Sequence, residues 1–392
     1  MENINQNEIL INHKELENMM YRVFNVNKTL NGKKKLALYI WGTTGIGKSD
    51  KVVSVANKLS KDQSREFVDW NRISKEEKYK VAENVSKYFI LFDYRLSSKD
   101  ITDLMGLPNL NGKDTVEWKV PLWLSVACQK NAMGIIFFDE LNLAPSSIQT
   151  QGYQLIRDGC LGEVSLSDGI TIISAGNTSE DRANVYDLPK PLQNRFIHVI
   201  LKIPELDDWV EWAVKHGVDR RIISFLNFKP TYLMKFDPDS RDKAFPTPRS
   251  WGEFCSNLIK DIQDESLLEI YSSSAIGNGC ATEFTSFIKM QKDLKLQDFL
   301  DNPERVNDLS IDLKWSLTSL LANWFKTHNT PTDADMLLKI VDYLESEYAI
   351  LTLRFVKEDN KVIFKNRMLK CKLWIEKLAH QYGKFLWEDV VN

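Results

Sequence analysis

The chain lacks the features that mark membrane, secreted and zinc-binding proteins. No hydrophobic run approaches the ~20 residues that a membrane-spanning helix needs. The first residues, Met-Glu-Asn-Ile-Asn-Gln, have neither the basic start nor the hydrophobic core of a secretory signal, so we expect no signal peptide. The five cysteines and five histidines among 392 residues are scattered and never form a C-x-x-C spacing, which argues against disulfides and a zinc site. These absences predict a cytoplasmic protein with no membrane segment.

The chain also lacks a large excess of charge of one sign. Its 51 Lys and Arg against 54 Asp and Glu give a net charge of −3, so no whole-molecule field attracts nucleic acid or an anionic membrane. One basic segment, Arg354 to Lys372, fits either a nucleic-acid patch or a solvated helix face, and we favour the helix face. Nucleic acid is therefore not an expected partner.

A glycine-rich loop follows the first strongly hydrophobic run. Residues 36–41 predict a strand, and the next eight read Gly-Thr-Thr-Gly-Ile-Gly-Lys-Ser, the phosphate-binding pattern G-x-x-x-x-G-K-[ST]. A helix-compatible segment begins near Asp50, so the motif has the strand–loop–helix context that distinguishes it from a chance glycine-rich turn. Backbone N–H groups of such a loop, together with the positive end of the helix dipole, bind phosphates. The residues expected to bind the nucleotide are Gly42, Thr43, Thr44, Gly45, Ile46, Gly47, Lys48 and Ser49.

Lys48 and Ser49 are expected to have distinct roles within that loop. The Lys48 ammonium would reach the β- and γ-phosphates, and the Ser49 hydroxyl would ligate Mg²⁺. The predicted cofactors are therefore ATP and Mg²⁺, although no sequence pattern separates ATP from GTP.

A second hydrophobic strand ends in two acids. Residues 134–138 are apolar and are followed by Asp139 and Glu140. Buried carboxylates are costly unless they meet a cation, so we expect Asp139 to hold Mg²⁺ and Glu140 to polarise the attacking water. The alternative is a strand that ends at a solvated acidic turn. Together with the upstream loop, the pair predicts hydrolysis of the nucleotide.

Asn177 and Arg195 are further candidates for the reaction. Asn177 ends an apolar strand, and it would help to orient the water if that strand lies between those carrying Gly42 and Asp139; the alternative is an Asn that caps a turn. Arg195 precedes a strand and suits a neighbouring subunit's nucleotide, where an arginine stabilises charge on the transferred phosphoryl group. Its alternatives are a surface salt bridge, and Arg182 in the same role.

Arg249 is the last candidate. It lies in the segment Ala244-Phe-Pro-Thr-Pro-Arg-Ser-Trp251, at a predicted helix start whose approach is fixed by prolines. It would fold a helical domain onto the phosphates, and the alternative is a proline-rich N-cap.

Apolar strands alternate with helical segments from residue 36 to residue 200, which predicts an α/β fold with a parallel five-stranded sheet. The predicted strands are 36–41, 88–94, 135–139, 170–175 and 196–200, with the polar stretch 60–87 as a crossover. Residues 106–121, with an Asn111-Gly112 turn, predict a hairpin. A second hairpin is expected between 161–166 and 170–175.

We divide the chain into four parts. These are a helical lead-in (1–35), the nucleotide-binding domain (36–203), a small helical lid (204–275) and a mostly helical extension of unknown role (276–392). Within the lid, the predicted helices are 207–215, 220–228 and 251–264.

The motifs together resemble those of AAA+ ATPases of the MoxR-like, dynein-related group. The resemblance covers residues 36–265 and is most specific in 41–49, 94–108, 137–144, 174–196 and 244–251. It implies that Lys48 and Ser49 belong to Walker A, Asp139 and Glu140 to Walker B, Asn177 to sensor 1, Arg195 to the arginine finger and Arg249 to sensor 2. It also implies that 106–121 is the helix-2 insert and 161–175 the hairpin before sensor 1. The family's frequent Gly-Pro-Pro-Gly loop start is here Gly-Thr-Thr-Gly, which makes the loop less rigid.

The resemblance implies a ring-forming, chaperone-like remodeller of a partner protein. The ring would be a hexameric homo-oligomer, with each site completed by Arg195 of the next subunit. The partner implied by the family is a protein with a von Willebrand factor A-type domain. The alternatives are a nucleic-acid motor or loader, which the acidic balance disfavours, and a nucleotide-gated scaffold with little turnover, which an intact Glu140 and Arg195 disfavour.

Overall fold

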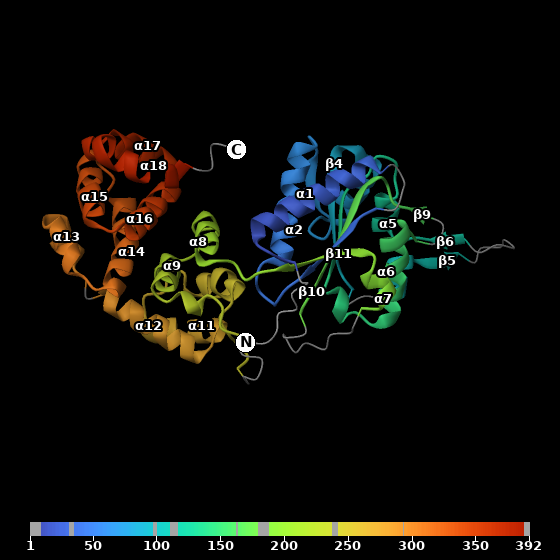
Figure 1. Ribbon diagram of the computed structural model, residues 1–392, viewed down its shortest axis with the longest axis horizontal. Helices are drawn as coiled ribbons and strands as arrows, with labels where there is room; N and C mark the ends of the chain where they lie inside the picture. The colour runs from blue at the N-terminus through green and yellow to red at the C-terminus, as the bar shows by residue number, and fades with distance from the viewer. Residues whose placement is uncertain are drawn as a thin grey trace. The chain divides into compact units, whose positions relative to one another are not determined.

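The computed structural model describes residues 9–30, 35–96, 100–109, 117–161, 164–178, 188–236, 242–292 and 294–387 (Figure 1). The chain forms two compact units, Met1–Pro204 and Glu205–Asn392. A further division of the second unit at residue 275 stays a prediction.

The first unit is built on a seven-stranded sheet in which every neighbouring pair is parallel, in the order β1-β11-β2-β10-β7-β4-β3. The strands are β1 (Leu10–Ile11), β2 (Ala37–Trp41), β3 (Glu66–Asp69), β4 (Tyr88–Arg95), β7 (Met133–Asp139), β10 (Gly169–Gly176) and β11 (Phe196–Leu201). The predicted α/β class with a parallel sheet is confirmed. The predicted count of five strands was wrong, because β1 and β3 extend the two edges. β1 has only two residues, and β3 reads Glu-Phe-Val-Asp, so neither has the longer apolar run of a strand buried on both faces.

Helices cover both faces of this sheet (Figure 1). On one face, α1 (His13–Thr29) and α2 (Lys48–Asp62) pack against strand residues such as Leu38 and Ile40. On the other face lie α5 (Leu122–Ala127), α6 (Ser146–Asp158) and α7 (Lys190–Gln193). Shorter elements of this unit are α3 (Lys75–Glu83), η1 (Val85–Lys87), α4 (Ile101–Met105) and η3 (Leu141–Leu143). The five central strands are thus buried on both faces, which explains their apolar sequences.

Two antiparallel hairpins accompany the sheet. β5 (Leu107–Asn109) pairs with β6 (Glu117–Lys119), which confirms the first predicted hairpin, although its Asn111-Gly112 turn lies outside the described residues. The second hairpin pairs β8 (Cys160–Leu161) with β9 (Val164–Ser165). The predicted hairpin with residues 170–175 was wrong, since those residues belong to the parallel strand β10. The reason is that Ser167 bonds back to the carbonyls of Ala127 and Ala132, which starts β10 beside β7.

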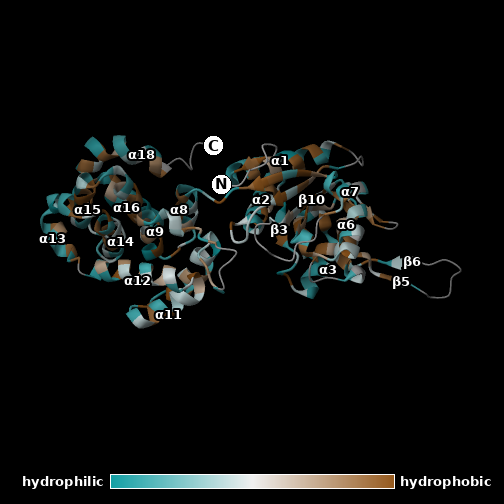
Figure 2. Ribbon diagram, turned by 60° about the horizontal axis from the view of Figure 1, so that its bottom comes forward, coloured by the Kyte–Doolittle hydropathy of each residue, from teal (hydrophilic) through white to brown (hydrophobic). Residues whose placement is uncertain are grey.

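Among its described residues the second unit contains helices and no strand, and the helices enclose one hydrophobic core. These helices carry both hydrophilic and hydrophobic residues (Figure 2). The helices are α8 (Leu206–Lys215), α9 (Arg220–Phe228), η5 (Pro230–Tyr232), η6 (Ser250–Cys255), α10 (Ser256–Ile259), α11 (Glu265–Ile276), α12 (Asn278–Lys292), α13 (Leu296–Asp301), η7 (Pro303–Asp308), α14 (Ile311–Thr327), α15 (Pro331–Tyr343), α16 (Ser346–Asp359), α17 (Lys361–Arg367), η8 (Met368–Lys370), η9 (Trp374–Leu378) and α18 (Ala379–Trp387). No helix within the described ranges is both long and apolar enough to cross a membrane.

The predicted helices 207–215 and 220–228 are confirmed as α8 and α9. The predicted helix 251–264 was wrong in its length: a π-helical turn, η6, leads into α10, which ends at Ile259. The chain turns there because the Arg221 guanidinium bonds the carbonyls of Ile259 and Ile262. Between them Asp261 has a φ of 64°, which a right-handed helix does not permit.

Candidate nucleotide-binding site

The glycine-rich loop, Asp139 and Asn177 meet at one edge of the sheet. Strand β10 lies between β2 and β7, the arrangement on which the prediction for Asn177 depends. In the strand register, Gly176 lies beside Trp41, and Ser174 lies beside Phe138. The residues that follow these strands therefore come together at the carboxyl edge, where open parallel sheets bind ligands.

The loop from Gly42 to Gly47 has the backbone of a phosphate-binding turn. Its three glycines all have positive φ, at 158°, 80° and 88°. Gly47 is the N-cap of α2 in a left-handed conformation, which costs any residue with a Cβ free energy. Because α2 begins at Lys48, its N–H-rich end faces the loop, as anion binding requires.

Lys48 connects the loop to the end of β10. Its side chain is only 8% exposed, and its Nζ atom donates to the carbonyls of Gly42 at 2.5 Å and Thr43 at 2.9 Å. It also lies 3.1 Å from Oδ1 of Asn177. These acceptors are neutral, whereas phosphate oxygens form shorter and stronger charge-assisted bonds. The geometry fits a lysine that exchanges backbone carbonyls for a phosphate.

Ser49 and Asp139 form a pair of oxygen donors. The Ser49 hydroxyl donates to Oδ2 of Asp139 at 2.7 Å, and the other carboxylate oxygen accepts the Glu140 N–H at 3.0 Å. Hard oxygen ligands suit Mg²⁺, which keeps several waters and takes one or two protein ligands beside substrate phosphates. No group of three or more His, Cys, Asp or Glu side chains in the described part of the chain forms a metal cluster. Two oxygen donors fit a nucleotide-bound Mg²⁺, which takes its other ligands from phosphates and water.

Glu140 has an unusual backbone. Its φ is 54°, in the left-handed region, and it opens the short helix η3. Non-glycine residues in this region cost free energy and concentrate at functional sites. The conformation turns the chain sharply after the buried Asp139, so the two acids occupy different environments.

Asn142 also belongs to this site, although the sequence analysis did not single it out. Its buried side chain bonds the backbone of Asn177. A loop asparagine usually indicates a turn. The one sequence signal for a role of Asn142 in the site was its place two residues after Glu140.

The loop also contacts the start of α1, which the sequence analysis did not predict. Nε2 of His13 donates to the Ile46 carbonyl at 2.8 Å. Just before it, Ile11 in β1 pairs with Leu201 in β11 and accepts a hydrogen bond from the Lys202 N–H at 2.9 Å. No sequence signal marks this contact.

Arg195 lies at the amino ends of the strands, opposite the carboxyl ends where the loop lies. The residue after it, Phe196, is beside Ala37, the first residue of β2, whereas the loop follows the last residue, Trp41. Four residues of strand separate the two ends, or ~13 Å. Within the described ranges, Arg195 forms no ion pair or side-chain hydrogen bond, so the alternative of a surface salt bridge is not observed. The rival Arg182 lies outside the described residues.

Arg249 belongs to the second unit. The helix in which it lies begins with a reciprocal cap: the Thr247 N–H donates to Oγ of Ser250, and the Ser250 N–H donates to Oγ1 of Thr247. Arg249 thus stands at a helix start, and its approach to the phosphates stays a prediction.

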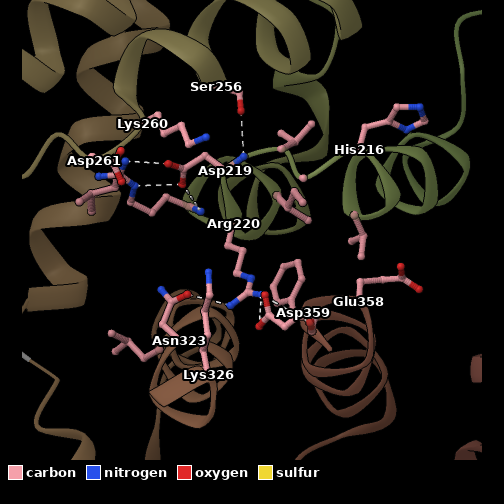
Figure 3. A pocket seen from close by; sticks show the side chains of 18 of the residues that line it. His216, Asp219, Arg220, Ser256, Lys260, Asp261, Asn323, Lys326, Glu358 and Asp359 are labelled. Carbon is pink, nitrogen blue, oxygen red and sulfur yellow. Dashed lines mark hydrogen bonds and ion pairs between the residues drawn. The ribbon is translucent and has the colours of Figure 1, made fainter. Parts of the chain in front are cut away.

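A cavity of about 760 Å³ in the second unit contains none of the predicted site residues. Figure 3 shows Arg220 there between Asn323 and Asp359. One of its guanidinium nitrogens donates to Oδ1 of Asn323 at 2.8 Å, and another pairs with Asp359. Nearby, Arg221 pairs with Asp219 at 2.7 Å. These arginines are engaged by internal partners, and Arg220 links α9 to α14 and α16.

Comparisons with known proteins return only distant structural likenesses. No protein-family model and no curated protein sequence matches this chain. The chain is similar to PCH-2 of C. elegans, at 10% identity over 72% of this chain and 70% of that chain, with a TM-score of 0.35. It is also similar to RuvB, the Holliday junction branch migration motor of Thermotoga maritima, at 13% identity over 70% of this chain and 68% of that chain, with a TM-score of 0.31. Likenesses of this degree carry no argument about function.

Proposed function

We propose that this chain is a Mg²⁺-dependent ATPase of the AAA+ class, in the MoxR-like group. The observation that carries the proposal is the convergence of four side chains at one sheet edge. Lys48 contacts Asn177, and Ser49 contacts Asp139. Such a group matches the needs of phosphoryl transfer, in which catalysis consists of positioning and charge stabilisation.

Each side chain has a defined part in the proposed reaction. Lys48 binds the β- and γ-phosphates, and Glu140 accepts the proton of the attacking water. Asn177 orients that water beside the terminal phosphate. Ser49 and Asp139 hold Mg²⁺, which supplies positive charge to neutralise the phosphates.

Arg195 completes the site of a neighbouring copy in this proposal. It lies at the end of the strands opposite the loop, and its side chain has no ion pair or hydrogen bond with the residues that the structure describes, which supports an action in trans. A hexameric ring of such copies would act as a chaperone-like remodeller of a partner protein with a von Willebrand factor A-type domain. Arg249 would serve as the sensor of the bound nucleotide from the helical lid.

The test is ATP hydrolysis per subunit across a wide range of protein concentration. We expect hydrolysis per subunit to rise with concentration. Glu140→Gln and Arg195→Ala should each lower kcat by ~10²-fold or more, since a general base and an arginine finger each contribute at least that much.

Mixing these two variants separates a shared site from a site within one chain. A Glu140→Gln subunit still offers Arg195 to its neighbour, so a mixture should recover part of the activity that neither variant has alone. Flat activity with concentration, together with full activity of Arg195→Ala, would overturn the ring.

A further inference from the structure

The Asn142 side chain forms two hydrogen bonds with the backbone of Asn177. Its Nδ2 atom donates to the Asn177 carbonyl at 2.8 Å, and its Oδ1 atom accepts the Asn177 N–H at 3.2 Å. Asn142 is fully buried, with 0% of its surface exposed. One amide thus satisfies both polar groups of a single backbone residue, as a neighbouring strand would.

The Asn142 amide provides hydrogen bonds just beyond the last paired residues of β10. The pairing of β10 with β7 ends at Ser174 and Phe138, and the pairing with β2 ends at Gly176 and Trp41. The N–H and C=O groups of Asn177 lie just beyond both ladders and need other partners. Asn142 supplies them and so fixes the direction in which the chain leaves β10.

The same side chain is anchored close to Glu140. Asn142 lies in η3, the turn that Glu140 opens, and the Leu143 N–H donates to the Glu140 carbonyl at 2.9 Å. A short, buried linkage therefore runs from the backbone of Glu140 through Asn142 to Asn177. It joins the proposed general base to the proposed water-orienting residue.

Gly176 has no side chain, which leaves room for the Asn142 amide beside it. A Cβ atom at Gly176 would lie 2.1 Å from the Tyr39 hydroxyl and 2.5 Å from Oδ1 of Asn142. Both distances are far below van der Waals contact, so a side chain at this position would displace the amide.

We propose that Asn142 is a positioning residue that holds Glu140 and Asn177 in register for hydrolysis; the proposal rests on the ATPase function proposed above. Asn142 acts through the backbone and does not touch the nucleotide. Its loss should therefore lower kcat and leave nucleotide affinity nearly unchanged.

The chain offers a matched control for Asn142 at the opposite end of the strands. Asn27 in α1 is 1% exposed and makes the same pair of bonds with Leu36, donating to its carbonyl at 2.9 Å and accepting its N–H at 2.8 Å. Leu36 precedes β2, so this second pair lies a full strand away from the loop. Asn27→Leu thus removes an equivalent buried amide at a distance from the reacting groups.

The experiment compares Asn142→Leu with Asn27→Leu in steady-state ATP hydrolysis, with ADP affinity and thermal unfolding measured on the same samples. We expect Asn142→Leu to lower kcat by roughly 10- to 100-fold, because a shift of ~1 Å at reacting groups costs up to ~10²-fold. ADP affinity should stay within about threefold, and Asn27→Leu should lower the Tm but leave kcat within about threefold, since it moves no reacting group.

Asn142→Asp keeps the test decisive if the leucine variant does not fold. The aspartate retains the acceptor for the Asn177 N–H but loses the donor to its carbonyl, so kcat should again fall while ADP still binds. An unchanged kcat in a folded Asn142 variant, or an equal fall of kcat in Asn27→Leu, overturns the positioning role of Asn142 and leaves the proposed ATPase function intact. If the unmodified chain does not hydrolyse ATP although it binds ADP, the ATPase proposal fails and this one with it.

Discussion

The Nζ atom of Lys48 lies 3.1 Å from Oδ1 of Asn177, although 129 residues separate the two in sequence. The contact joins the loop after β2 to the end of β10. Both side chains therefore face one point, where a single phosphate group could meet them together.

Lys48→Ala should weaken nucleotide binding. The lysine is a buried cation that donates to the carbonyl oxygens of Gly42 and Thr43. Hydrogen bonds to charged groups contribute about 1.5–3 kcal/mol, or roughly 10- to 150-fold in affinity. Calorimetric titration with ADP measures the loss. Lys51→Ala is the matched control, because Lys51 lies on the same helix and pairs with Glu17 at 3.1 Å. Equal ADP affinity in Lys48→Ala and Lys51→Ala would contradict the proposed role of Lys48 in nucleotide binding.

Removal of Mg²⁺ with a chelator should abolish hydrolysis, since the ion that Ser49 and Asp139 are proposed to hold would neutralise the phosphate charge. Ser49→Ala should raise the Mg²⁺ concentration for half-maximal hydrolysis by roughly tenfold, the effect of losing ~1.4 kcal/mol. Ser60→Ala serves as the control, because Ser60 is a buried serine of α2 whose hydroxyl donates to the Asn57 carbonyl. A Ser49→Ala variant with unaltered Mg²⁺ dependence would remove Ser49 from the metal site.

Asp93 should make the stability of the nucleotide-free, Mg²⁺-free protein depend on pH. Burial, assisted by the neighbouring Asp139 charge, raises the pKa of Asp93 from 3.8 to about 6. Because the folded-state pKa is raised, the folded protein binds this proton more tightly, and stability falls as pH rises from 3.8 through 6. Asp93→Asn should therefore raise the Tm at pH 7.5, by a margin that shrinks below pH 6 and closes near pH 4. A margin that is constant from pH 4 to 8 would show that the charge of Asp93 is not responsible.

Arg220→Ala should destabilise the second unit. Its guanidinium bonds Asn323 and Asp359, and the Arg220 and Asp359 side chains are each only 17% exposed. Loss of hydrogen bonds to a charged group costs about 1.5–3 kcal/mol, which thermal unfolding measures. Lys339→Ala removes an exposed pair with Asp335 and should cost at most about 0.5 kcal/mol. Similar losses in the two variants would mean that Arg220 does not link the helices.

The sequence predicted those parts of the fold that rest on local chemistry. The five central strands are apolar because both of their faces are covered, and the loop from Gly42 to Ser49 needs its residue types for its backbone shape. Strand β3 escaped prediction because it reads Glu-Phe-Val-Asp at the sheet edge, where burial imposes no apolar run. The partners of Ser167 lie far away in the chain, so no local pattern indicated where β10 would pair.

In the candidate site, too, the residues with a local sequence signal were predicted and those defined by distant contacts were not. Lys48, Asp139 and Asn177 stand at strand ends, where the order of strands brings them together. Asn142 could not be predicted, because its role depends on a bond to a residue 35 positions away. His13 is a similar case, since its bond to Ile46 exists only after α1 has packed on the sheet.

The contact of His13 with Ile46 fixes the glycine-rich loop to the start of α1. His13 follows Ile11, which holds Lys202 through a backbone bond, and the first unit ends two residues later, at Pro204. The loop and the last residues of the first unit are thus held by the same short segment, residues 11–13. A substitution in that segment would disturb both of them.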